Sequence, residues 1–502
     1  MNVINAPKND FSDISLAVMP FNILADHYGS QLAATQLQLE HEAHTEGEKR
    51  FLKAMERQIK AGEFADNAVA KPLMTTLVPK FVSAWTEWFT TVESKRGGRP
   101  VAYTKVQGCS PEVAGFITLK TVLSCLTREE HSHLQFVASA IGRSIEDELR
   151  FGRIRDEEAK HFKNHIQDAL NKRVGAVYKK AFMQAVEGKM LDANQLTNKW
   201  SSWTPEENIH VGVRMLELLI ASTGLVELSR PYAGSIAKDA EYVTLTAEYT
   251  ELLSKRAGAL AAISPMHQPC VVPPKPWTSP TGGGYWAAGR KMTVLIRTNT
   301  RKGLERYNDV HMPQVYKAVN LAQNTPWKIN KKVLAVANEI TRWKHCPIED
   351  MPALERGELP IRPDDMDTNE VALKAWKKEA AGVYRKEKAR VSRRLSMEFM
   401  LQQANKFSQF KAIWFPMNLD WRGRVYAIPM FNPQGNDMTK GLLTMAKGKP
   451  IGLDGFYWLK IHGANTAGVD KVPFPERIKF IEDNHENILA CATDPLGNTW
   501  WA

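Results

Sequence analysis

The clearest chemistry in this sequence lies in a short charged run around a glycine, Asp420-Trp421-Arg422-Gly423-Arg424. Arginine binds phosphate through a planar fork of N–H donors, and a glycine lets the backbone approach a ligand closely. Asp420 can orient one of the two guanidinium groups, so the run predicts an anion-binding loop. Further candidate donors follow at Gly435, Asn436, Lys440, Lys447 and Lys449. The five residues alone leave a second interpretation open, a buried Asp–Arg pair beside a glycine turn.

Other candidate ligands are weaker. Glu157, His161 and His165 are spaced four residues apart and would share one face of a helix, as metal ligands can. Charged neighbours surround them, which favours a solvated helix with i,i+4 pairs. The stretch 441–449 lacks the spacing of a phosphate-binding P-loop and the Ser or Thr after its lysine. We therefore predict no metal site and no P-loop.

Helices must position most of these residues. Residues 1–260 show apolar side chains at helical spacing, for example at 51–60 and 211–220. A passage at 263–290 contains six prolines and a run of three glycines, which exclude a continuous helix. Its aromatic residues predict that it packs down, and we expect it to join an N-terminal domain to the rest.

The second half of the chain alternates between helices and shorter elements. Thr325-Pro326 predicts the start of a helix, because Thr is a good N-cap and Pro suits the first helical position. Further helices are expected at 371–407, 455–464 and 475–493. Aromatic and β-branched residues with turn formers at 413–433 predict short strands. The expected fold class is mainly α with a smaller α+β portion.

The charge of the chain points to a polyanionic partner. Lys and Arg number 66 against 55 Asp and Glu, which gives a net charge of +11 and a pI near 9.2. Residues 371–411 carry eleven Lys and Arg against three Asp and Glu, whereas the first fifty residues are acidic. Such a balance favours nucleic acid or an acidic membrane surface.

Several classes of protein are excluded by composition. No apolar run approaches the ~18 residues of a transmembrane helix, and the N-terminal sequence does not resemble a secretory signal. The five cysteines are scattered without a CxxC pair, which argues against disulfides and zinc knuckles. The sequence therefore predicts a soluble cytosolic protein.

The DWRGR run resembles the DxxGR motif of single-subunit phage-type RNA polymerases, the group made by the odd-numbered T coliphages and their relatives. The resemblance extends over essentially the whole chain. Four more strings carry it, namely IEDELRFGRIRDEEAKHFK (145–163), NKRVGAVYKKAFMQ (171–184), CVVPPKPWTSPTGGGYWA (270–287) and WLKIHGANTAGVDKVPFPERIKF (458–480). Because these strings are long and low in degeneracy, the chain is identified as a member of this family.

The resemblance implies the parts of a right-hand polymerase. Residues 1–324 would be a helical promoter-binding domain, 325–411 the thumb and 412–502 the start of the palm. In this family the DxxGR segment contacts the template strand and the RNA–DNA hybrid, and the basic thumb grips nucleic acid. The nucleic-acid-binding residues that this implies are Asp420, Arg422, Gly423, Arg424, Tyr426, Lys440, Lys388, Arg393 and Arg394.

Two promoter-binding elements are also implied. A basic loop carrying Lys95, Arg96 and Arg99 resembles the family's reader of an AT-rich upstream region, where a narrow minor groove attracts arginine. An ordinary basic surface turn is the alternative. Residues 229–237 lie where the family has an intercalating hairpin, and Ile236 is our choice for the apolar wedge that unstacks a base step.

The family's catalytic machinery is expected elsewhere. Two-metal nucleotidyl transfer needs carboxylates that hold Mg²⁺, and the resemblance places the two palm aspartates beyond residue 502. We therefore expect no catalytic residue and no metal ligand in this chain, and reject Asp420 and Asp437 for that role. Trp500-Trp501 at the end favours a truncated piece of a longer protein, since such side chains usually lie under something.

The resemblance implies a monomeric DNA-directed RNA polymerase without membrane attachment. It would transcribe double-stranded promoter DNA from NTPs with Mg²⁺, in the cytoplasm of the infected bacterial host, and hold the template and the RNA–DNA hybrid. The 502-residue chain alone is expected to bind nucleic acid without polymerising. The alternatives are a complete, non-catalytic nucleic-acid-binding protein and a DNA-binding regulatory or architectural factor that uses only the helical N-terminal half.

Overall fold

The structure is a computed structural model, and it divides into two compact units. Unit 1 is described within His44–Pro265, and unit 2 combines the described residues before His44 with those from Met266 onward. The three segments expected from the sequence remain a prediction. The structure describes residues 15–128, 132–173, 175–193, 195–196, 198–229, 241–287, 293–298, 303, 305–307, 309–344, 348, 351–365 and 368–501.

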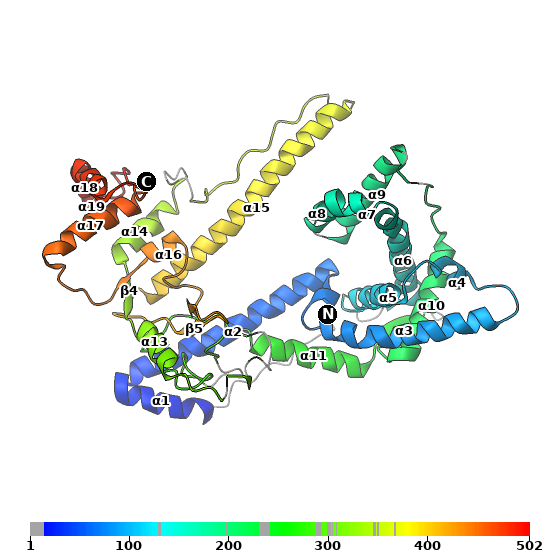
Figure 1. Ribbon diagram of the computed structural model, residues 1–502, viewed down its shortest axis with the longest axis horizontal. Coiled ribbons are helices and arrows are strands. Elements are labelled where there is room, and N and C mark those ends of the chain that lie inside the picture. The colour runs from blue at the N-terminus through cyan, green and yellow to red at the C-terminus, as the bar shows by residue number, and fades with distance from the viewer. Residues whose placement is uncertain are drawn as a thin grey trace, which may run out of the picture. The chain divides into compact units, whose positions relative to one another are not determined.

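Unit 1 is built mainly of helices (Figure 1). Its elements are the second half of α2 (Ser30–Ala61), η1 (Phe64–Asp66), α3 (Lys71–Ser94), α4 (Val101–Val106), α5 (Pro111–Leu126), β1 (Ser132–His133), α6 (Leu134–Glu157), α7 (Ala159–His161), η2 (Phe162–Ile166), α8 (Gln167–Asn171), α9 (Ala176–Asp192), α10 (Pro205–Thr223), β2 (Val226–Ser229), β3 (Tyr242–Leu245) and α11 (Ala247–Ala262).

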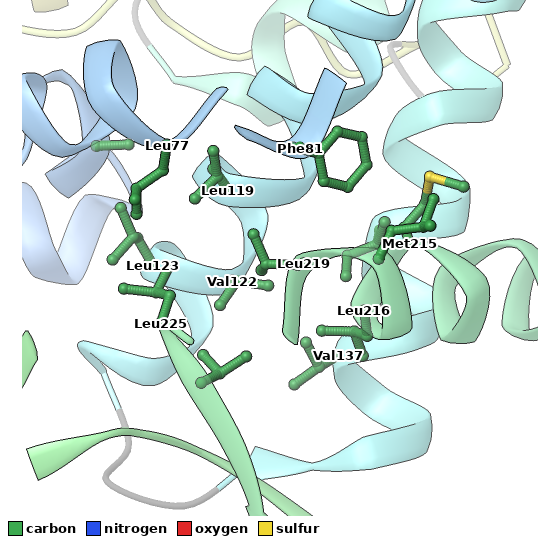
Figure 2. Packing of buried hydrophobic residues seen from close by; sticks show 14 of the residues in the cluster. Leu77, Phe81, Leu119, Val122, Leu123, Val137, Met215, Leu216, Leu219 and Leu225 are labelled. Atoms are coloured by element: carbon green, nitrogen blue, oxygen red, sulfur yellow. The ribbon is translucent and has the colours of Figure 1, made fainter. Parts of the chain in front are cut away.

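The core of unit 1 lies where α3, α5, α6 and α10 meet. Figure 2 shows apolar side chains from these helices pointing toward one another, with Leu119 and Leu219 among those fully excluded from solvent. Two glycines let α6 and α10 approach closely. A Cβ at Gly142 or Gly212 would lie closer than 3.0 Å to backbone atoms of the facing helix, so a larger residue would force the two helices apart.

Two smaller features complete unit 1. The short strands form an antiparallel sheet in the order β1-β3-β2, with Val226 opposite Leu245 and Ser132 opposite Val243. Residues from the end of α6 to Leu196 form a separate small core. There, Glu187 on α9 is almost fully buried and pairs with Arg150 and Arg153 of α6, so ion pairs as well as apolar contacts join α9 to α6.

Unit 2 combines helices with two-stranded sheets. Its elements are α1 (Ser15–Tyr28), the first half of α2, α13 (Pro313–Gln323), β4 (Trp327–Ile329), α14 (Lys331–Ile340), α15 (Glu370–Phe407), β5 (Met417–Leu419), β6 (Val425–Ala427), α16 (Asp437–Gly441), β7 (Leu443–Met445), α17 (Gly452–Thr466), α18 (Phe474–Asp483) and α19 (His485–Thr493). The pairs β4–β7 and β5–β6 are antiparallel.

The Pro- and Gly-rich passage belongs to unit 2 from Met266 onward. Trp277 is 1% exposed, and its indole Nε1 donates to the Met417 carbonyl at 2.9 Å. The Tyr285 hydroxyl donates to the Gln268 carbonyl at 2.8 Å. These contacts confirm that the passage packs down, as its aromatic residues predict.

Side chains on the first half of α2 hold the Pro- and Gly-rich passage by hydrogen bonds to its backbone. The Gln36 side-chain oxygen accepts from the Val271 N–H at 2.8 Å, and the Glu40 carboxylate accepts from the N–H groups of Trp286 and Ala287. Burial raises the pKa of Glu40, and these hydrogen bonds offset only part of that effect. Thus one helix contributes to both units.

The expected fold class, mainly α with a smaller α+β portion, is confirmed. Helix α15 runs unbroken over nearly the predicted range (Figure 1), and Asn369 caps it by accepting from two backbone N–H groups. Among the described residues, no helix combines the length and apolar character that a membrane crossing requires.

Two predicted helix boundaries are wrong. Thr325-Pro326 precedes strand β4, because residues 327–329 pair with β7, and α14 begins later with Asn330 as its N-cap. The predicted helix at 475–493 is two helices that break at Asn484, whose side-chain amide donates to the Phe480 carbonyl at 2.8 Å.

Candidate nucleic-acid interface

The DWRGR run forms the tip of the β5–β6 hairpin. Its strands pair with Asn418 opposite Tyr426 and Leu419 opposite Val425. The Asp420 N–H donates to the Arg424 carbonyl at 2.9 Å, and the Gly423 N–H donates to the Asp420 carbonyl at 3.0 Å. Gly423 has a φ of 85°, a conformation that other residues adopt at a cost. The tight turn therefore requires glycine at this position.

Asp420 organises the whole tip. Its Oδ1 accepts from the backbone N–H groups of Arg422 and Arg424, both at 2.9 Å. Its Oδ2 accepts from Nε of the same two residues, at 3.2 and 2.9 Å. One carboxylate therefore orients both guanidinium groups, where the sequence suggested one.

The two arginines remain open to solvent. The side chains of Arg422 and Arg424 are 51% and 55% exposed, whereas that of Asp420 is 13% exposed. This geometry argues against the alternative of a buried Asp–Arg pair. Each arginine binds Asp420 through Nε, so this carboxylate does not occupy its terminal N–H groups. Two cationic forks held on one anchor can bind neighbouring phosphates.

The charges at the tip reinforce one another. Partial burial acts to raise the pKa of Asp420, but hydrogen bonds from Arg424 and the positive charges of Arg424 and Arg297 outweigh it and hold the pKa below its usual value. The hydrogen bond to Asp420 raises the pKa of Arg424. The anchor is therefore ionised at neutral pH.

Two residues that hold the hairpin were missed by sequence reasoning. Arg297 donates through Nε to the Asn418 side-chain oxygen at 2.9 Å and through Nη2 to the Ala427 carbonyl at 3.3 Å. Gln434 accepts from the Ala427 N–H at 2.8 Å and donates to the Val425 carbonyl at 2.9 Å. Arg297 lies more than a hundred residues before the hairpin, and no local pattern marks it.

The predicted thumb residues lie on α15, and no hydrogen bond or ion pair found among the described residues links them to the hairpin. Lys388 and Arg393 are exposed. Arg394 pairs with Glu398 at 2.9 Å and donates to the Thr341 carbonyl at 3.3 Å. The helix thus carries two exposed cations, Lys388 and Arg393, and a third, Arg394, that already binds other residues of the chain.

The remaining predicted residues are dispersed. Lys440 lies on α16 and pairs with Asp437 at 2.9 Å. Lys95, Arg96 and Arg99 lie in an exposed loop between α3 and α4, where the Arg99 guanidinium also donates to the Val92 carbonyl. Ile236, the predicted wedge, lies outside the described residues.

The structure offers little for a metal ion. The described part of the chain contains no group of three or more His, Cys, Asp or Glu side chains that could hold one. The rings of His161 and His165 lie 4.9 Å apart, beside each other on the helical segment that the sequence predicts.

Comparison with known proteins places the sequence of this chain in a family. Residues 35–324 match the family described as DNA-directed RNA polymerase N-terminal. The chain belongs to this RNA polymerase family. A second match, to the family described as DNA-dependent RNA polymerase, covers residues 449–502 of the polymerase chain.

Phage relatives of this polymerase family are similar over the whole chain. T7 RNA polymerase of Escherichia phage T7 is 66% identical over 503 aligned residues, which cover 100% of this chain and 57% of the relative. The DNA-directed RNA polymerases of Enterobacteria phages T3 and K11 are 65% and 60% identical, again over 100% of this chain and over 57% and 58% of each relative.

A plant relative is more distant. DNA-directed RNA polymerase 2, chloroplastic/mitochondrial, of Arabidopsis thaliana is 29% identical over 72% of this chain and 39% of its own length. The matches confirm the predicted resemblance to phage-type polymerases. They also show that this chain spans little more than half the length of its phage relatives.

Proposed function

We propose that this chain supplies the promoter- and hybrid-binding part of a DNA-directed RNA polymerase. The polymerase would act as a monomer in the cytoplasm of an infected bacterium, copying a DNA template into RNA from NTPs. One observation carries the proposal: a chain of this family presents two half-exposed arginines on one ionised carboxylate.

The hairpin tip suits a nucleic-acid backbone. Because Asp420 already holds Arg422 and Arg424 through their Nε atoms, binding loses less side-chain freedom than it would with unrestrained arginines. The exposed Trp421 ring, 74% accessible, stands between them in sequence and offers a face on which a base can stack. These features support contact with the template strand in the RNA–DNA hybrid.

Other charged surfaces extend the proposed contacts. Lys388, Arg393 and Arg394 on α15 supply cations for the backbone of the hybrid. The loop with Lys95, Arg96 and Arg99 offers exposed cations for the minor groove of an AT-rich promoter segment.

Mg²⁺ belongs to the proposed reaction, where it would supply charge stabilisation for phosphoryl transfer, yet the acids nearest the hairpin do not fit it. Both oxygens of Asp420 accept hydrogen bonds from arginine. Asp437 is 98% exposed and paired with Lys440. We therefore assign Asp420 to orientation of the arginines.

A binding experiment tests the proposed contact. Fluorescence anisotropy would measure the affinity of the 502-residue chain for an RNA–DNA hybrid at several salt concentrations. Loss of one phosphate contact in Arg424→Ala should lower the affinity about five- to eightfold at about 0.1 M salt and reduce the salt slope by about one. Lys344→Ala, which removes an exposed charge paired with Glu355, is the control. Equal effects of the two substitutions would refute the assignment.

A second experiment tests the enzymatic part of the proposal. Transcription from a promoter template by the isolated 502-residue chain should yield no RNA, and any templated product would overturn this expectation. A chain that binds promoter duplex but shows no affinity for the hybrid would instead support a DNA-binding regulatory factor.

A further inference from the structure

The backbone around Arg297 is fixed against strand β5. The Arg297 N–H donates to the Leu419 carbonyl at 2.8 Å, and the Leu419 N–H donates to the Leu295 carbonyl at 2.6 Å. Ile296 thereby forms a parallel bridge with Leu419. Leu295 is fully buried, so the segment that carries Arg297 is anchored in the core of unit 2.

The guanidinium of Arg297 then ties the two strands of the hairpin together. It donates to the side chain of Asn418 on β5 and to the carbonyl of Ala427 on β6. Its planar fork suits two acceptors at once. The bonds lie on the two strands of the hairpin, two residues before Asp420 and three residues after Arg424.

A ring connects Arg297 to the tip itself. The guanidinium carbon of Arg297 lies 5.3 Å from the ring centroid of Tyr426, and that of Arg424 lies 5.7 Å from the same centroid. Both distances are within the range of cation–π attraction. Tyr426 therefore contacts one arginine at the base of the hairpin and one at its tip.

We propose that Arg297 is a positioning residue for Arg424. By fixing Asn418, Ala427 and Tyr426, Arg297 sets the direction in which the Arg424 guanidinium points toward the nucleic-acid backbone. This role rests on the proposed function, in which Arg424 contacts the RNA–DNA hybrid. In this role Arg297 affects binding through Arg424 and does not contact a phosphate itself.

A double-mutant cycle separates this action from direct binding. The affinity of the 502-residue chain for an RNA–DNA hybrid is measured for Arg297→Ala, Arg424→Ala and the double variant. Arg297→Ala should weaken binding about two- to fivefold, and this loss should vanish in the Arg424→Ala background, because coupled residues are not additive. If the fold-loss of affinity in the double variant equals the product of the losses in the two single variants, the proposal is overturned.

Two further variants sharpen the cycle. Arg297→Lys keeps the charge but loses the planar fork, so its affinity should match that of Arg297→Ala; restored affinity would mean direct charge contact and would overturn the proposal. Arg477→Ala is the matched control, because Arg477 likewise bonds an asparagine side chain and backbone carbonyls and lies 5.2 Å from the Phe474 ring. It should leave hybrid affinity unchanged.

Hydrogen–deuterium exchange tests the positioning without nucleic acid. Arg297→Ala should speed exchange of the amides of residues 417–427, whereas Arg477→Ala should not. Unchanged exchange at the hairpin would overturn the role of Arg297 even if Arg424 binds the hybrid. If exchange speeds up while neither Arg424→Ala nor Arg297→Ala alters affinity, the positioning stands as a structural role and the proposed hybrid contact fails.

Discussion

The close crossing of α6 and α10 can be tested by adding one methyl group. In Gly212→Ala the new Cβ would lie closer than 3.0 Å to three backbone atoms of Ala138. Backbone cannot swing away as the end of a flexible side chain can, so the two helices must separate. Overpacking of this kind costs up to about 3 kcal/mol, while replacing glycine by alanine inside a helix gains about 1 kcal/mol.

The net expectation is a loss of about 2 kcal/mol in the free energy of unfolding of unit 1. For a unit of this size, that loss lowers Tm by about 4–8 °C, which differential scanning calorimetry of the 502-residue chain would measure. Gly188→Ala on α9 is the control, because its Cβ would meet nothing within 4 Å and should leave Tm equal or slightly higher. A Gly212→Ala variant as stable as the control would refute the reasoning.

Three further predictions concern buried polar groups. Glu187→Gln removes the charge between two arginines. As with other broken buried ion pairs, it should lower the free energy of unfolding by about 3 kcal/mol. Faster hydrogen exchange of α9 would show this loss, and unchanged exchange would contradict it. Because the pKa of Glu40 is raised in the folded state, the free energy of unfolding of unit 2 should rise as pH falls from neutral toward the ordinary glutamate range. Calorimetry against pH measures this slope, which should be smaller in Glu40→Gln; an equal slope would exclude Glu40 as its source. Burial raises the pKa of Cys109 to about 11 and that of Cys270 well above its usual value. Native protein treated with iodoacetamide near neutral pH should therefore show both thiols unmodified by mass spectrometry. Rapid labelling of either thiol would count against the packing.

Local signals in the sequence located the elements that depend on local interactions. Helix α15 was predicted because its residues favour a helix over a long stretch, and its Asn369 cap is a neighbour in sequence. Aromatic and β-branched residues at 413–433 likewise predict short strands, and β5 and β6 lie within that range. Where a residue's structure depends on its neighbours, the sequence was sufficient.

Pairing between residues far apart in the sequence could not be predicted from local signals. Thr325-Pro326 carries a good capping signal, but pairing of 327–329 with β7, more than a hundred residues later, decides that segment. Arg297 donates a hydrogen bond to Asn418, which also lies more than a hundred residues later in the sequence. Neither pairing leaves a mark on the local pattern, so the sequence could identify the arginines of the tip but not the residue that holds the hairpin beneath them.

The shared helix α2 has a consequence for shortened forms of this protein. A product that starts at the internal Met55 would keep most of unit 1, yet it would lack Gln36 and Glu40. The N–H groups of Val271, Trp286 and Ala287 would then lose their partners, at about 1–3 kcal/mol for each that stays buried. An N-terminal deletion would thus also damage unit 2, which carries the arginine hairpin, at residues that lie more than two hundred positions after the cut.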